Sequence, residues 1–260
     1  MIKLVACDID GTLLHTGETE ISPKVFEQLE RLHKMGVVFC AASGRQYCSL
    51  HRMFAKFADK MYYICNNGAV VYGPYSEEKG FGKVLSKSPL PRKSAEEICN
   101  YLLSKDYFEV MIGGESLEYI IPKSHDLSEH LSFIGYEYKK VLTPEEIPED
   151  MIKVTAFCPR GAAERIEELS ARYSGKFNVS ISGERWIDIT VSNKGTGLSH
   201  LCGELNIPLG DAMAIGDNYN DLPMFALAGH PVVMKSAAPE IASQVSVSCN
   251  SVEEMLAQII

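Results

Sequence analysis

The most constraining feature of the sequence is a short apolar run near its N-terminus that ends in two carboxylates and a glycine. The run Leu4–Cys7 leads directly into Asp8, Asp10 and Gly11, which is typical of a buried parallel strand opening into a loop. Alternation along an extended chain directs Asp8 and Asp10 to the same side. Two carboxylates about 5 Å apart at an effective dielectric of about 20 repel by about 3 kcal/mol. The pair therefore requires a cation, a shared proton or solvent, and a solvated acidic turn is the simplest alternative.

Length and charge exclude several classes of protein. At 260 residues and 46% hydrophobic composition, the chain can bury one large core, or a core and a second module. A net charge of -9 argues against a nucleic-acid-binding surface. The sequence has no apolar run long enough for a membrane span and no expected signal peptide. A soluble cytoplasmic protein without a membrane or nucleic-acid partner is therefore expected.

Strand, loop and helix patterns repeat on both sides of the middle of the chain. Ser22 and Pro23 favour a helix start and Gly36 its end. The apolar run 37–42 then delivers Ser43, and the run 61–65 delivers Asn66. The pattern resumes with a helix from Lys194 and a strand at 212–215, and further short strands are expected at 231–234 and 245–247. Repeated units of this kind predict an α/β fold, with a Rossmann-like parallel-sheet core formed by residues 1–80 and 189–260.

Residues 81–188 have a different character. A capping-box pattern at Ser94 predicts a helix to Leu103, and a second helix is expected over 162–173. Strand-like runs occur at 109–112, 117–121, 153–157, near 179 and at 186–191. This order predicts an inserted α+β cap domain.

Polar side chains follow several of the expected core strands, and the ordered set resembles a known family. The matching segments are Asp8-Ile9-Asp10-Gly11-Thr12, Ser43-Gly44-Arg45, Asn67-Gly68-Ala69, Lys194-Gly195 and Gly216-Asp217 with Asn220-Asp221. The chain resembles the haloacid dehalogenase-like phosphatases, specifically the Cof-type sugar-phosphatase branch with a large cap (class IIB).

The resemblance implies a role for each catalytic position. Asp8 would be the nucleophile that forms an aspartyl-phosphate, and Asp10 the general acid and base. Ser43 would donate a hydrogen bond to the phosphoryl oxygens, and Lys194 would supply the positive charge that balances them. The alternative for Lys194 is that it only forms the start of a helix, with no catalytic role.

The resemblance also implies a metal site. Mg2+ would be held by Asp8, Asp217 and Asp10, the last through its backbone carbonyl. Asn220 and Asp221 would orient the waters on the ion and Lys194.

Substrate contacts are expected from both parts of the chain. In the core the candidates are Gly44, Arg45, Asn67 and Gly68, although Arg45 could be a surface ion-pair residue and Asn67-Gly68 only a turn. In the cap the candidates are Glu184, Arg185 and Trp186, with a purely structural role in the cap core as the alternative for Trp186.

The resulting functional hypothesis is a Mg2+-dependent phosphatase for small phosphorylated metabolites such as sugar phosphates. It would act as a monomer or weak homo-oligomer. One alternative is a phosphosugar mutase or phosphotransferase, which would pass the phosphoryl group to a sugar hydroxyl. The other is a phospho-accepting, receiver-like binding module. Receivers carry the accepting aspartate after a middle strand and lack a large insertion, whereas Asp8 follows the first expected strand.

Overall fold

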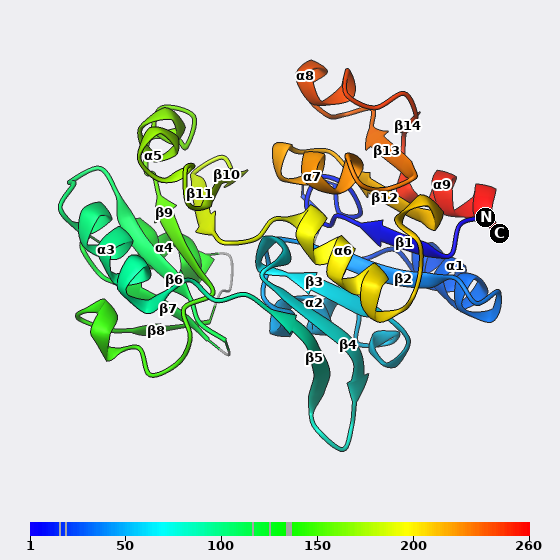
Figure 1. Ribbon diagram of the computed structural model, residues 1–260, viewed down its shortest axis with the longest axis horizontal. Coiled ribbons are helices and arrows are strands. Elements are labelled where there is room, and N and C mark those ends of the chain that lie inside the picture. The colour runs from blue at the N-terminus through cyan, green and yellow to red at the C-terminus, as the bar shows by residue number, and fades with distance from the viewer. Residues whose placement is uncertain (16, 19, 116, 125, 134–136) are drawn as a thin grey trace. The chain divides into compact units, whose positions relative to one another are not determined.

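The computed structural model describes residues 1–15, 17–18, 20–115, 117–124, 126–133 and 137–260. The chain forms two compact units (Figure 1). We call Met1–Lys87 together with Asn193–Ile260 the core domain, and Ser88–Ser192 the inserted domain. Each is described separately below.

The core domain is built on an eight-stranded sheet with the order β14-β13-β12-β1-β2-β3-β4-β5. Neighbouring strands from β14 to β3 are parallel, whereas β4 pairs antiparallel with both β3 and β5. The strands are β1 Leu4–Cys7, β2 Val38–Ala42, β3 Tyr62–Cys65, β4 Val70–Ser76, β5 Phe81–Lys87, β12 Ala212–Gly216, β13 His230–Met234 and β14 Ser248–Cys249.

Helices lie on both faces of this sheet (Figure 1). The helices are α1 Pro23–Lys34, α2 Tyr47–Met53, α6 Lys194–Glu204, α7 Leu222–Phe225, α8 Pro239–Ala242 and α9 Val252–Ile259. The Ser22 hydroxyl accepts a hydrogen bond from Val25 N and caps α1 as the sequence predicts. At α6 a reciprocal capping box joins Asn193 and Thr196. This box fixes the start of the helix that carries Lys194.

The position of β1 decides where the loops gather. β1 pairs in parallel with β12 on one side and β2 on the other. The loops that follow these three strands therefore leave the sheet at the same edge, at a point where the strand order reverses. Ligands bind at such points in open α/β sheets.

The inserted domain contains a six-stranded sheet with the order β10-β11-β9-β6-β7-β8. All its neighbouring strands pair antiparallel except β7 and β8, which are parallel. Its elements are α3 Arg92–Leu103, β6 Glu109–Gly113, β7 Glu118–Ile121, α4 Asp126–Phe133, β8 Tyr138–Lys140, β9 Lys153–Phe157, α5 Ile166–Tyr173, β10 Asn178–Gly183 and β11 Trp186–Thr190.

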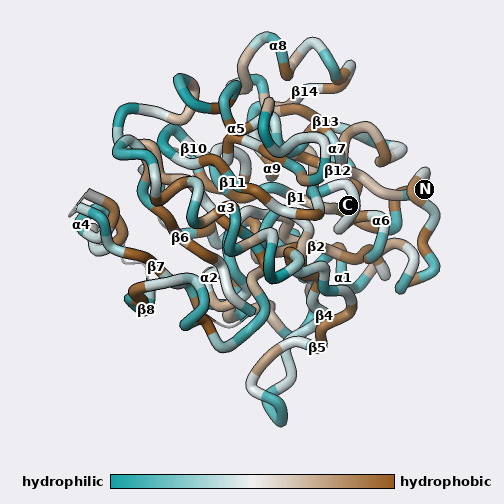
Figure 2. Tube along the Cα trace, turned by 60° about the vertical axis from the view of Figure 1, so that its left-hand side comes forward, coloured by the Kyte–Doolittle hydropathy of each residue, from teal (hydrophilic) through white to brown (hydrophobic). Residues whose placement is uncertain are grey.

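Two hydrophobic clusters lie on opposite faces of the inserted sheet. Val110 and Val154 belong to the larger cluster, which also contains residues of α3 and α5. Met111 and Phe157 face the other way, with Leu127 of α4. Figure 2 shows the hydrophobic stretch along β6 and the hydrophilic tip of the β4–β5 hairpin of the core domain. Because successive side chains of a strand point to opposite faces of the sheet, the same strands contribute residues to both clusters.

Together these features confirm the expected α/β class, with a Rossmann-like core and an inserted α+β domain. Some boundaries differ from the prediction. The insertion spans 88–192 rather than 81–188, because residues 81–87 form β5 and pair with β4 of the core sheet. Strand β11 ends at Thr190 within the inserted domain.

Two local predictions were wrong. Ser94 does not start α3, which begins at Arg92 after Pro91 without a side-chain cap. The last core strand is Ser248–Cys249 rather than 245–247, because its two residues pair with Val233 and Met234 of β13.

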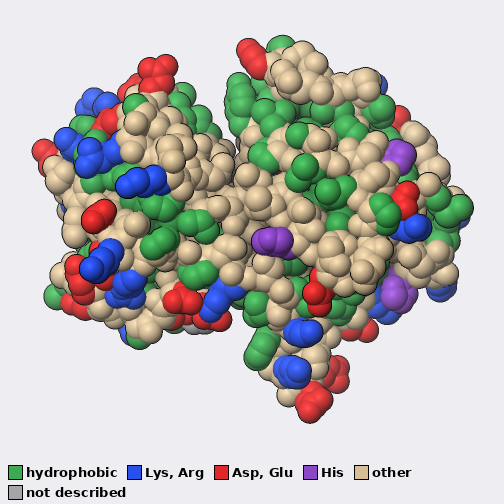
Figure 3. All heavy atoms as spheres, in the orientation of Figure 1, with side chains coloured by type: hydrophobic (Ala, Val, Ile, Leu, Met, Phe, Trp, Pro, Cys, Tyr) green, Lys and Arg blue, Asp and Glu red, His purple; other side chains and the backbone are tan. Residues whose placement is uncertain are grey.

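No helix in the described part of the chain is both long and apolar enough to span a bilayer. On the face of the inserted domain that Figure 3 shows, lysine and arginine side chains are interspersed with acidic ones.

Candidate active site

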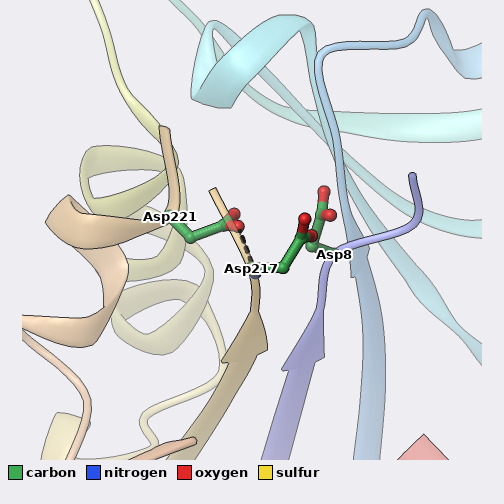
Figure 4. Close-up of side chains that lie close together, drawn as sticks. All are labelled: Asp8, Asp217 and Asp221. Atoms are coloured by element: carbon green, nitrogen blue, oxygen red, sulfur yellow. Dashed lines mark hydrogen bonds between the residues drawn. The ribbon is translucent and has the colours of Figure 1, made fainter. Parts of the chain in front are cut away.

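Three aspartates converge at the shared edge of the core sheet (Figure 4). Asp8 directly follows β1 and Asp217 directly follows β12, while Asp221 lies one turn further along the chain. Each offers a carboxylate oxygen, and these oxygens all lie within 4.8 Å of one another. The backbone N–H of Asp8 donates to the carbonyl of Ile215 at 2.9 Å and ties the ends of the two strands together.

A buried lysine links two of these carboxylates. Lys194, the first residue of α6, has no exposed surface. Its Nζ donates to Asp8 Oδ1 at 2.5 Å and to Asp221 Oδ1 at 2.6 Å. The other oxygen of Asp221 accepts the backbone N–H groups of Asp217 and Asn218, each at 2.9 Å. Both oxygens of Asp221 are therefore engaged, which suits it to orient Lys194.

Burial and charge shift the protonation of this cluster in opposing directions. Burial raises the pKa of Asp8 well above its ordinary value, although the Lys194 ammonium opposes the shift. Burial also raises the pKa of Asp217, against the hydrogen bond from Thr12. For Lys194 burial lowers the pKa, but the two neighbouring carboxylates outweigh it and the net shift is upward. The lysine thus stays charged, and the aspartates lack enough positive charge to balance them.

Glycine makes room for the carboxylate of Asp217. Gly11 has a φ of +92°, and a Cβ there would lie 2.4 Å from Asp217 Oδ2. Thr12 donates from its Oγ1 to Asp217 Oδ1 at 2.6 Å, so the loop after β1 holds both sides of this carboxylate. A Cβ on Gly216 would lie 2.4 Å from the carboxyl carbon of Asp221. The two glycines therefore permit the close packing of the aspartates.

Ser43 follows β2 and is 1% exposed. Its loop is joined to the loop after β3 by main-chain hydrogen bonds, from Asn67 N to Ser43 O and from Asn66 N to Arg45 O, each at 3.0 Å. Asn66 and Asn67 both have positive φ, at 50° and 53°. Left-handed backbone in non-glycine residues is costly and concentrates at functional sites. Asn66 is not among the site residues predicted from the sequence, although an Asn-Asn-Gly run is a signal for this backbone conformation.

Arg45 forms a two-pronged ion pair with Asp10. Its Nε donates to Asp10 Oδ2 at 2.8 Å and its Nη2 to Oδ1 at 2.6 Å. The side chain of Asp10 is 56% exposed and that of Arg45 34%. Arg45 thus forms an ion pair, and its partner is the second aspartate of the loop after β1. Ser49 accepts a further hydrogen bond from Arg45 Nη1.

Asn67 and Asn220 lie together although they are far apart in the sequence. The Asn220 side-chain amide donates to Asn67 Oδ1 at 3.0 Å. Asn220 Oδ1 is buried and accepts no hydrogen bond from the residues that the structure describes. Gly44 lies against the side chain of Asn67, because a Cβ added at Gly44 would be 3.2 Å from Asn67 Nδ2. Gly68 touches the start of α6, where a Cβ would lie 2.0 Å from the Asn193 carbonyl oxygen.

The three candidates in the inserted domain do not form one polar cluster. Glu184 and Arg185 are exposed at the turn between β10 and β11. Trp186 packs against Phe157 and His130, with ring centroids 4.8 and 5.6 Å apart. Trp186 is partly buried and packs against the smaller hydrophobic cluster of the inserted domain, and a substrate role for the three residues remains a prediction.

Comparison with known proteins places this geometry in a family. Residues 5–257 match the family model described as haloacid dehalogenase-like hydrolase. The chain belongs to this family. A curated relative from Serratia proteamaculans, named HMP-PP phosphatase, is 28% identical over 94% of this chain and 87% of its own length. A relative from Escherichia coli, named 5-amino-6-(5-phospho-D-ribitylamino)uracil phosphatase, is 24% identical over 92% of this chain and 88% of its own length.

A solved haloacid dehalogenase-like structure has the same fold. It is described as a subclass IIB sugar phosphatase, superposes with a TM-score of 0.82 at 20% identity, and covers 99% of this chain and 98% of its own. The family expected from the motifs is confirmed. The expected enzyme class, a phosphoric monoester hydrolase, is supported by relatives that are named phosphatases.

Proposed function

We propose that this haloacid dehalogenase-like protein is a Mg2+-dependent phosphatase that hydrolyses small phosphorylated metabolites, sugar phosphates among them, through an aspartyl-phosphate on Asp8. The observation that carries the proposal is the contact of Lys194 with both Asp8 and Asp221, beside Asp217. Such a cluster holds one carboxylate ready for attack and provides positive charge for a phosphoryl group.

Each proposed step uses a group that the core domain places at this edge of the sheet. An oxygen of Asp8 attacks phosphorus, the ester P–O bond breaks, and Asp10 gives its proton to the leaving oxygen. Water then attacks the phosphorus of the aspartyl-phosphate, and Asp10 takes a proton from this water. The acyl phosphate P–O bond breaks, which releases inorganic phosphate and restores Asp8. Splitting one displacement into two is the benefit of covalent catalysis.

Lys194 and Ser43 provide charge and hydrogen bonding for the transferred group. The ammonium of Lys194 is held by Asp8 and Asp221, so it needs little reorganisation during the reaction. Ser43 is held by the main-chain contacts of its loop, and its hydroxyl would donate to a phosphoryl oxygen. Positioning and electrostatics of this kind carry most of the catalysis in phosphoryl transfer.

The donor set fits Mg2+. Carboxylate oxygens are the ligands that this hard cation prefers, and burial has left Asp8 and Asp217 with raised pKa values that a nearby cation would reverse. Asp8, Asp217 and the backbone carbonyl of Asp10 would hold the ion, and Asn220 with Asp221 would orient its waters. When bound, it would offset the negative charge of the phosphoryl oxygens.

Substrate choice belongs to the proposal as well. Two relatives are named as phosphatases of small phosphorylated metabolites. Arg45 and Asn67, with Gly44 and Gly68, are proposed to contact the substrate from the core domain. The inserted domain is proposed to act as a cap that recognises the remainder of the substrate, with Glu184, Arg185 and Trp186 as candidates. A cytoplasmic location and a monomeric or weakly associating state complete the proposal.

A panel of phosphate monoesters tests it, with inorganic phosphate and isomerised sugar phosphates both measured as products. The wild-type chain should release phosphate with Mg2+, lose turnover in EDTA, and recover when Mg2+ is restored. Asp8→Asn should lose at least about 10⁴-fold in turnover. Asp59→Asn, which changes an exposed aspartate of the same domain, is the matched control and should keep full activity.

Several outcomes would count against the proposal. Turnover by Asp8→Asn at the wild-type rate would exclude this nucleophile. Isomerised sugar phosphate in place of free phosphate would indicate a mutase. A phosphorylated protein that persists for minutes without turnover would indicate a receiver-like module.

A further inference from the structure

The inserted domain contains a pocket of about 410 Å3 that shares no residue with the aspartate cluster. It is lined by Asp106 and Tyr107, which lead into β6, by the turn Cys158–Gly161, which follows β9, and by Arg165. The two linkers to the core domain leave from the opposite end of the inserted sheet, near the start of β9. In the first linker, Leu90 N donates to Met151 O just before β9. The second linker follows β11, whose Ile189 pairs with Val154 of β9. The pocket is therefore a separate feature of this domain.

Arg165 is held by an aromatic ring. Its guanidinium carbon lies 4.0 Å from the centroid of the Tyr107 ring. Stacking fixes the plane of the guanidinium and leaves the N–H groups at its edge available for an acceptor. Within the described part of the chain, Arg165 forms no ion pair with a carboxylate.

The expected partner of Arg165 is engaged elsewhere. Glu168 lies three residues later in α5, and Arg165 precedes the first residue of that helix, so the two side chains are close enough in sequence to pair. Glu168 Oε1 instead accepts the Tyr101 hydroxyl at 2.8 Å, and both oxygens of Glu168 accept the Tyr107 hydroxyl, at 3.1 and 3.2 Å. The two tyrosine hydroxyls thus engage the oxygens of Glu168, which forms no ion pair with Arg165.

A tight turn presents a second arginine at the same pocket. Gly161 N donates to Cys158 O at 2.9 Å, with Pro159 at the second position of the turn, where proline is favoured. Gly161 has a φ of +119°, which glycine adopts readily. Arg160, which lies between Pro159 and Gly161, is exposed and forms no ion pair among the described residues. With Asp106 as the opposing charge, the lining has a net positive charge.

From this arrangement we infer that the pocket binds a small organic oxyanion, a phosphate ester or a carboxylate, through Arg160 and Arg165. Arginine binds such groups through paired N–H donors. A volume of about 410 Å3 falls in the range of small-molecule sites and leaves space for an organic part beside the anionic group. This site is additional to the proposed phosphatase centre and does not depend on it.

Amide NMR of the isotope-labelled full chain tests the inference. Inorganic phosphate, glycerol phosphate and malonate are each titrated in metal-free buffer at constant ionic strength, with Gly161 and Tyr107 as reporters. At least one probe should produce saturable shifts at both residues. The double variant Arg160→Gln/Arg165→Gln should raise the dissociation constant at least tenfold. The matched control is Arg172→Gln, because Arg172 stacks in the same way on Tyr101 at 4.0 Å but does not line the pocket.

The probes also distinguish the kinds of anion. Saturation by the phosphates alone identifies a phosphate site, and saturation by malonate alone a carboxylate site. Linear shifts with all three probes, or equal binding by the wild type and the double variant, would overturn the inference. The readout is independent of catalysis: Asp8→Asn should keep the pocket shifts even where turnover is lost.

Discussion

Lys194 and Asp8 are 186 residues apart in the sequence, yet Lys194 Nζ lies 2.5 Å from Asp8 Oδ1 in the interior of the core domain. The contact depends on the start of α6, which the Asn193–Thr196 capping box fixes. A Cβ at Gly195 would lie 2.4 Å from the carbonyl oxygen of Pro223, so the start of this helix must contain a glycine. The lysine is thus positioned by backbone packing as well as by its two carboxylate partners.

Lys194→Met should destabilise the protein and abolish turnover. The change leaves Asp8 and Asp221 buried without their shared cation, and breaking a buried pair in this way costs about 3 to 5 kcal/mol. Chemical denaturation at pH 7 in EDTA measures the loss. Lys60→Met is the control, because Lys60 makes a partly exposed ion pair with Glu30 on the surface and its loss should change stability little. Equal stability of Lys194→Met and wild type would contradict this account.

Gly11→Ala should abolish activity by displacing Asp217. Gly17→Ala is a matched control, because Gly17 has a nearly identical φ of +91° but no atom within 4 Å of its would-be Cβ. Both changes introduce backbone strain of about 1 to 2 kcal/mol. Only Gly11→Ala should also lose Mg2+ affinity, measured by calorimetry, and turnover. The same activity loss in both variants would attribute the effect to strain alone.

Arg45→Lys should lower kcat/KM by about tenfold while leaving the unfolding free energy nearly unchanged. Lysine keeps the positive charge but cannot make the two-pronged contact with Asp10. The exposed ion pair itself adds only about 0 to 1 kcal/mol to stability, so its effect should be kinetic. Steady-state kinetics and denaturation on the same variant check both parts, with Arg31→Lys on the exposed face of α1 as the control. An unchanged kcat/KM would show that Arg45 is only an ion-pair residue.

Glu118 should make the inserted domain less stable as the pH rises. Burial raises the pKa of Glu118 above its ordinary value, against the Lys153 ammonium, whose Nζ lies 3.8 Å from Glu118 Oε1. The folded state therefore holds this proton more tightly than the unfolded state. The stability linked to it is present below the unfolded pKa of about 4.3 and is lost as the pH rises through the folded pKa.

Denaturation followed by fluorescence of the single tryptophan, Trp186, reports on the same domain. Glu118→Gln should lack the loss of stability that the wild type shows between acid and neutral pH. Glu167→Gln, at an exposed position of α5, should follow the wild type. Parallel pH profiles for wild type and Glu118→Gln would show that this carboxylate has no linked proton.

Local sequence patterns were enough to predict the class of fold and the types of side chain at the site. Continuous apolar runs predicted parallel strands, and Asp8, Ser43 and Asp217 each follow one of these runs. Because parallel strands end at the same edge of a sheet, these three residues were expected to lie close together. Local pattern also predicted the start of α1 at Pro23, since capping depends on neighbours in the chain.

Which of these groups pair with one another depends on the packing of distant segments. The contact of Arg45 with Asp10, the two carboxylates around Lys194 and the engagement of Glu168 by Tyr101 all join segments that no local pattern connects. The same holds for β5, whose pairing with β4 places it in the core domain. Hydrogen bonds and ion pairs between distant segments depend on distance in space, which is established only when the strands and helices pack.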